Sequence, residues 1–104
     1  MKKIYLLVLS FWSCQPKRHV DIADIRQAEN IVLHATKPYP YRMMVQVRGY
    51  VNDTALIGNV KIGKGKVDMA YYEGDYYADT FTVRYYPYRA DSGHLRVDYQ
   101  FFTN

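Results

Sequence analysis

The chain has 104 residues and a formal net charge of +4, which leaves room for one domain of ordinary size. Hydrophobic residues make up 49% and charged residues 23% of the sequence, with only 6 glycines and 4 prolines. This composition excludes a disordered, collagen-like or coiled-coil chain, and its one excess is in tyrosine, with 12 residues.

The first fourteen residues carry the pattern of a secretory signal. Lys2 and Lys3 provide a positive head, residues 4–12 are mainly apolar, and the segment ends in Ser13 and Cys14. A membrane-spanning helix needs about 20 apolar residues, so this run is too short to be one. A charged start, a brief apolar stretch and a small residue at the end indicate a segment that directs export.

The end of this segment resembles the signal of bacterial lipoproteins, in which an apolar residue and then a small residue precede the cysteine that is lipidated. Phe11 takes the apolar place, Ser13 the small one and Cys14 that of the acceptor, whereas Trp12 stands where a small residue is usual. The resemblance implies a signal peptide over residues 1–13, a diacylglycerol group and fatty acyl chains such as palmitate on Cys14, and stable membrane anchoring. The cysteine count agrees, because disulfide-stabilised secreted domains usually carry an even number and this chain has one. The alternative is a buried first strand with an incidental cysteine.

Processing after Ser13 would remove two lysines, lower the formal charge from +4 to +2 and place the protein in the bacterial cell envelope. The outer membrane is the expected location. A charge this small gives no reason to expect a nucleic-acid partner. Residues 14–29 are predicted to form a tether or arm, because the stretch around Pro16 is polar and has no periodicity. Ile22, Ile25 and Ala28, spaced three apart, would suit one or two helical turns, and an extended arm fits nearly as well.

Residues 30–104 are predicted to form one β domain. Short runs of alternating apolar and polar residues recur about every 8–12 residues, separated by residues typical of turns. This pattern indicates an all-β fold, a small antiparallel β-sandwich of about six or seven strands or a small barrel. The expected runs cover residues 31–36, 42–51, 59–63, 67–72, 80–86 and 95–101, and the expected turns include residues 52–54, 73–75 and 89–93.

The last two of these runs are expected to pair as a hairpin. Pairing Val83 with Tyr99 would bury the apolar side chains of both strands on one face. The same register would set Arg84 opposite Asp98, a cross-strand ion pair worth a few tenths to about 1 kcal/mol.

No set of catalytic residues emerges from the sequence. Ser92 beside His94 lies in a glycine-containing turn and lacks the Gly-x-Ser-x-Gly pattern, and the three histidines lack the spacing of zinc ligands. Residues 63–66 lack the spacing of a phosphate-binding loop, although their lysines together with Lys61 could meet anionic headgroups or glycans. Asp75 and Asp79 could offer oxygen ligands to calcium, but the spacing of a calcium loop is missing and a solvated turn is the simpler interpretation. We therefore expect no enzyme, no metal and no cofactor.

The tyrosine excess indicates a binding surface. Alternation and turns place several tyrosines outward beside charged residues, where aromatic rings stack on sugars or act as hot spots for a protein partner. The same rings could equally line the core. The candidate surface consists of Tyr72, Tyr76, Tyr86, Tyr88, Arg84 and Arg96.

The sequence accordingly predicts a lipid-anchored, non-enzymatic β-sandwich that binds a partner protein in the cell envelope. Two alternatives stay open, a carbohydrate-binding module and an inhibitor or immunity lipoprotein that blocks an enzyme. Residues 74–77, 86–87 and 93–101 resemble the end of small β-sandwich lipoproteins of bacterial envelopes. This resemblance implies a fold and a location, but no named activity and no site residues.

Overall fold

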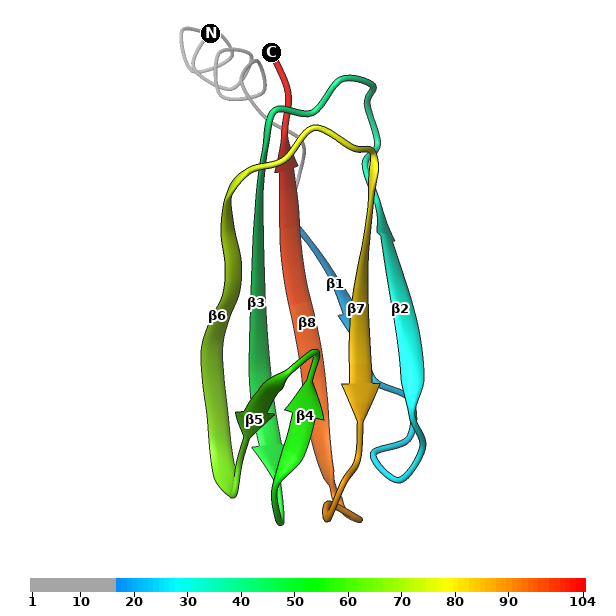
Figure 1. Ribbon diagram of the computed structural model, residues 1–104, viewed down its shortest axis with the longest axis vertical. Helices are drawn as coiled ribbons and strands as arrows, with labels where there is room; N and C mark the ends of the chain where they lie inside the picture. The colour runs from blue at the N-terminus through cyan, green and yellow to red at the C-terminus, as the bar shows by residue number, and fades with distance from the viewer. Residues whose placement is uncertain (1–16) are drawn as a thin grey trace, which may run out of the picture.

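The computed structural model describes residues 17–104, which form two antiparallel sheets packed face to face (Figure 1). The strands are β1 (Arg18–Asp21), β2 (Glu29–His34), β3 (Arg42–Val51), β4 (Ala55–Ile57), β5 (Val60–Ile62), β6 (Gly65–Asp75), β7 (Thr80–Tyr86) and β8 (Gly93–Phe102). One sheet has the order β1-β8-β3-β6, called the β8 sheet below, and the other the order β2-β7-β4-β5, called the β7 sheet. The predicted small β-sandwich is confirmed, with eight strands. Residues 17–104 include no helix of the length and apolarity that a membrane crossing requires.

The core lies between the two sheets and is built from every second residue of the long strands. In β3 the side chains of Met43, Val45 and Val47 are fully buried, while those between them face outward, as the alternation predicts. Leu95 and Val97 of β8 are fully buried in the same way. Because successive side chains of a strand point to opposite faces, each sheet presents one apolar face to the other and one polar face to solvent.

The predicted hairpin between the last two strands is wrong, because β7 and β8 belong to different sheets. β7 pairs with β2 and β4, whereas β8 pairs with β1 and β3. Val83 lies opposite Ile31 rather than Tyr99, and Asp98 lies opposite Gln46 rather than Arg84. The alternating apolar side chains of β7 and of β8 are nevertheless buried. Two strands that face each other across a sandwich show the same alternation as two strands that pair within a sheet.

The folded unit begins earlier than expected. β1 pairs with β8 from Arg18 to Asp21, and Ile22 and Ile25 are buried in the core. A turn follows, in which the Gln27 N–H donates a hydrogen bond of 3.1 Å to the carbonyl of Asp24. Residues 18–29 therefore belong to the sandwich, which corrects the predicted extent of the tether over residues 14–29.

A β-bulge interrupts the alternation of β6. Val45 of β3 lies opposite Tyr72, but the next residue, Gln46, lies opposite Ala70, so Tyr71 is an extra residue in the strand. The bulge turns Tyr72 from the predicted outward position toward the interior. The predicted turn at residues 73–75 is also wrong, because β6 continues to Asp75 and the chain turns at residues 76–79.

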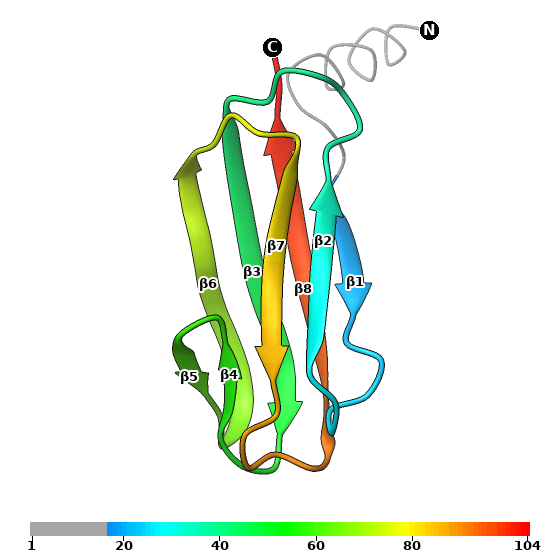
Figure 2. The same ribbon diagram turned by 45° about the vertical axis from the view of Figure 1, so that its right-hand side comes forward.

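The loops gather at the two ends of the sandwich (Figure 2). One end, called the Tyr39 end below, is formed by residues 35–41, 76–79 and 103–104. Its two loops are joined by a hydrogen bond of 2.9 Å from the Ala35 N–H to the Asp79 carbonyl. The Tyr41 N–H donates a bond of the same length to the carbonyl of Phe102, so the loops and the last strand form one connected surface.

Candidate binding surface

Arg84 and Tyr86 lie side by side on the outer face of the β7 sheet. They alternate along β7 with the buried Val83 and Tyr85, so both side chains point to solvent. The exposed fraction of Tyr86 is 53%. Pairing with β4 and a hydrogen bond of 2.8 Å from the Gly58 N–H to the Arg84 carbonyl hold this part of the strand in place.

Tyr88 extends the exposed group beyond the end of β7. Its backbone has φ 51°, a left-handed conformation that costs a non-glycine residue about 1 kcal/mol or more, and its side chain is half exposed. The guanidinium of Arg89 lies 5.3 Å from the centre of its ring, within the range of a cation–π contact. The Arg89 N–H is bonded to the Thr54 carbonyl at 3.0 Å, which holds the turn against the loop after β3. The end formed by residues 52–54 and 87–92 is called the Tyr88 end below.

The outer face of the β7 sheet carries cations without carboxylates. Its outward positions are Asn30, Val32, His34, Leu56, Lys61, Thr80, Thr82, Arg84 and Tyr86. Within residues 17–104, neither Arg84 nor Lys61 takes part in an ion pair. Leu56 lies opposite Tyr86 on one side and Lys61 on the other, so an apolar centre is flanked by positive charge. We call the group of Leu56, Lys61, Arg84 and Tyr86 the Tyr86 face.

Arg96 lies on the other side of the molecule, on the outer face of the β8 sheet. Its Nε atom is 3.1 Å from the Oδ1 atom of Asp98, whose side chain is only 9% exposed. The Nη1 atom of Arg48 lies 3.9 Å from the other oxygen of Asp98, and the Nε atom of Arg48 lies 3.5 Å from the Oδ1 atom of Asp68. Arg96 is thus neutralised within its own sheet, in contrast to Arg84.

Tyr72 and Tyr76 form part of an aromatic cluster instead of an exposed surface. The centre of the Phe81 ring lies 5.4 Å from that of Tyr72 and 5.2 Å from that of Tyr76. The Tyr72 hydroxyl donates a hydrogen bond of 2.5 Å to the Asp75 carbonyl, and the Tyr76 hydroxyl donates one to the Thr80 carbonyl. These rings pack against the core near the Tyr39 end. Of the six predicted surface residues, the structure therefore places Arg84 and Tyr86 side by side on one outer face, and Tyr88 exposed in the turn that follows.

Sequence reasoning missed Leu56, and it considered Lys61 only as a contact to anionic headgroups or glycans and not as part of this surface. Residues 55–57 show too short a run to assign a face, and residues 59–63 were predicted as a strand without a known neighbour. Only the pairing of Leu56 with both Lys61 and Tyr86 places them beside the exposed tyrosine. No local sequence signal marks this contact.

Ser92 and His94, which are separated by one residue in the sequence, form contacts in the turn and at the start of β8. The Ser92 N–H donates a hydrogen bond of 3.1 Å to the Oδ1 atom of Asn52, and the Nε2 atom of His94 lies 3.5 Å from the Oδ1 atom of Asp21. Within residues 17–104, no group of three or more histidine, cysteine, aspartate or glutamate side chains is close enough to hold a metal ion, and this includes the surroundings of Asp75. Cys14, the predicted lipid acceptor, lies outside the described residues.

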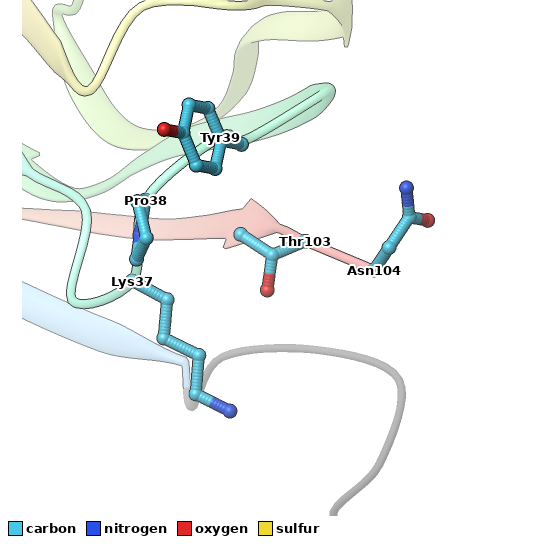
Figure 3. Close-up of a pocket in the computed structure, with 5 residues that line it drawn as sticks. All are labelled: Lys37, Pro38, Tyr39, Thr103 and Asn104. Atoms are coloured by element: carbon cyan, nitrogen blue, oxygen red, sulfur yellow. The ribbon is translucent and has the colours of Figure 1, made fainter.

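An open hollow of ≈ 400 Å³ lies at the Tyr39 end (Figure 3). It is lined by Lys37, Pro38, Tyr39, Thr103 and Asn104. Among residues 17–104, no carboxylate side chain and no thiol lines it. Comparison with protein-family models, with curated proteins and with solved structures finds no match for this chain.

Proposed function

We propose that this chain is a lipid-anchored, non-enzymatic β-sandwich that binds a partner protein in the bacterial cell envelope through the Tyr86 face. The observation that carries the proposal is the combination on this face of an exposed tyrosine with an arginine that has no carboxylate partner within residues 17–104. Tyrosine and arginine are enriched among the residues that dominate binding energies, and they act best around a desolvated apolar centre. Leu56 supplies such a centre between Tyr86 and Lys61.

The charge of the Tyr86 face defines the chemistry of its partner. Arg84 and Lys61 are positive, and no outward position of the four strands of the β7 sheet is acidic. A partner with an apolar side chain ringed by aspartate or glutamate would match both features. Because exposed charges are screened by salt, the rate of association is expected to fall as the ionic strength rises.

The membrane part of the proposal rests on the first fourteen residues. The positive head, the apolar run and the Ser13–Cys14 end support acylation of Cys14. Two or three acyl chains would hold the protein stably at a membrane. The mass of the intact protein purified from the membranes of its native cells tests this directly, since acylation and loss of residues 1–13 both change it. Retention of Met1 without a fatty acid would refute the anchor.

The binding part is tested by affinity capture from the same membranes with two substitutions of matched exposure. Tyr86→Ala removes an exposed ring from the Tyr86 face, and Tyr50→Ala removes a ring of equal exposure, 53%, from the outer face of the β8 sheet. Both residues point to solvent, so both variants should stay folded. We expect one envelope protein to be lost with Tyr86→Ala and with Arg84→Glu, and to be retained with Tyr50→Ala. Equal recovery with all three variants would contradict binding at this face.

A further inference from the structure

The most exposed large hydrophobic side chains within residues 17–104 lie at the Tyr39 end. Tyr39 is 87% exposed and Tyr77 is 72% exposed, and Tyr41 of the same end is 38% exposed. The loops that carry them are joined by a hydrogen bond of 3.1 Å from the Tyr76 N–H to the Tyr41 carbonyl. Several aromatic rings therefore stand out from one end of the sandwich, with nothing in the described chain covering them.

The first strand brings the start of the chain to this same end. Arg18 lies opposite Tyr99, three positions before β8 ends at Phe102, and the two strands are antiparallel. The start of β1 therefore lies toward the Tyr39 end, where β8 finishes (Figure 2). Cys14 is four residues before Arg18 in the sequence, and four residues of fully extended chain span at most about 14 Å. Arg18 is level with Tyr99, and β8 runs six residues from there to its start at Gly93, roughly 20 Å, so Cys14 cannot reach the Tyr88 end.

We infer that the Tyr39 end is the membrane-docking end of the protein, with the rings of Tyr39 and Tyr77 seated among the lipid headgroups. This inference rests on the proposed acylation of Cys14, which fixes the lipid near that end. Tyrosine suits the position because its ring is apolar and its hydroxyl remains hydrated at the headgroup level. The loops contribute one cation, Lys37, and one anion, Asp79, so the attraction comes from the aromatic rings and not from net charge.

The backbone around Tyr39 holds its side chain away from the sandwich. Tyr39 has φ 60° and stands between Pro38 and Pro40, both of which restrict the chain. A left-handed tyrosine costs about 1 kcal/mol or more, and such strained residues often occur at functional sites. Figure 3 shows Tyr39 at the rim of the hollow, across from the end of the chain at Asn104.

This orientation would leave the Tyr86 face free. β7 starts at Thr80 beside the Tyr39 end and reaches Tyr86 six residues later, roughly 20 Å along the strand. Tyr88 lies farther still, at the opposite end. A bilayer at the Tyr39 end would therefore not compete with a partner on the Tyr86 face.

Tryptophan fluorescence provides the test, because Trp12 is the one tryptophan of the sequence and is removed with the proposed signal. The variants Tyr39→Trp and Tyr77→Trp place a probe at the docking end. Tyr50→Trp places a matched probe near the other end, since Tyr50 lies opposite His94 at the start of β8. Each acylated protein is purified from membranes and reconstituted into phosphatidylcholine vesicles whose acyl chains are brominated near the headgroup.

We expect the emission of Tyr39→Trp and Tyr77→Trp to shift to the blue and to lose about half of its intensity, as a ring at the interface should. The emission of Tyr50→Trp in brominated vesicles should equal its emission in vesicles of unbrominated lipid. High salt should not change the emission of any of the three variants. Equal quenching of the three variants, or none at all, on protein whose intact mass shows acylation would overturn the docking orientation and leave the anchor standing. An intact mass without acyl chains would overturn both the anchor and the orientation.

Discussion

The hydroxyl group of Tyr85 donates a hydrogen bond of 2.7 Å to the backbone carbonyl of Ile25, sixty residues earlier in the chain. Tyr85 comes from the middle of the β7 sheet, and Ile25 comes from the turn that follows β1 in the β8 sheet. Both side chains are buried. The bond therefore fastens the first segment of the sandwich to its core and satisfies a carbonyl that water does not reach.

Replacing Tyr85 with phenylalanine should lower the free energy of unfolding by about 1–3 kcal/mol, because the Ile25 carbonyl would lose its partner. Urea unfolding followed by circular dichroism measures the change. Tyr86→Phe is the matched control, since its ring faces solvent and its loss of a hydroxyl should change stability by less than about 0.5 kcal/mol. Equal stability of the two variants would show that the buried bond contributes nothing.

The stability of the protein should also fall at high pH because of the same residue. Burial raises the pKa of Tyr85 above its ordinary value of 10.0, and the nearby carboxylate of Asp24 raises it further. The folded state thus holds the proton more tightly than the unfolded state, so the stabilisation is complete below pH 10 and is lost as the pH rises through the pKa of the folded state. Unfolding free energies measured on both sides of this range should show a decline that is smaller in Tyr85→Phe. A decline of the same size in the variant would assign it to other groups.

Gly49 permits the close approach of β3 and β8. A β-carbon on this residue would lie 2.0 Å from the carbonyl oxygen of His94, and the backbone of Gly49 has φ 146°. Gly49→Ala should cost several kcal/mol, because the obstacle is backbone and the two central strands would have to separate. Gly65→Ala is the control, since φ is 98° there but no atom lies within 4 Å of the added carbon. Thermal unfolding should place Gly49→Ala well below Gly65→Ala, and similar midpoints would exclude the clash as the cause.

Asp98 is the buried carboxylate of the β8 sheet and lies between two arginines. Asp98→Ala should cost about 1–3 kcal/mol, because Arg96 and Arg48 would lose a shared, partly desolvated partner. Asp75→Ala removes an exposed carboxylate that forms no ion pair within residues 17–104, and it should be nearly neutral. Chemical unfolding compares the two variants, and an Asp98→Ala protein as stable as the control would contradict a structural role for the network.

The candidate surface shows where sequence reasoning succeeds and where it ends. Arg84 and Tyr86 point outward because β7 alternates without interruption, so each lies one position after a buried residue, Val83 or Tyr85. Tyr72 follows an equally regular run, but the bulge at Tyr71 reverses its direction. A bulge is a property of the pairing between β3 and β6, so the alternation of residues within β6 alone does not reveal it.

Period-two alternation by itself determined that this chain folds as a small all-β domain. It also determined which side chains of β3 and β7 are buried, because the residues on one face of an uninterrupted strand are every second residue of the sequence. Which strand lies beside which was decided only in three dimensions. Val83 and Tyr99 are buried as their alternation requires, yet they reach the core from different sheets, since an apolar face is covered equally well by a neighbour in the same sheet or by the sheet across from it. The same freedom placed Asp98 in the other sheet from Arg84, which has no carboxylate partner within residues 17–104, and drew residues 18–21 into the β8 sheet.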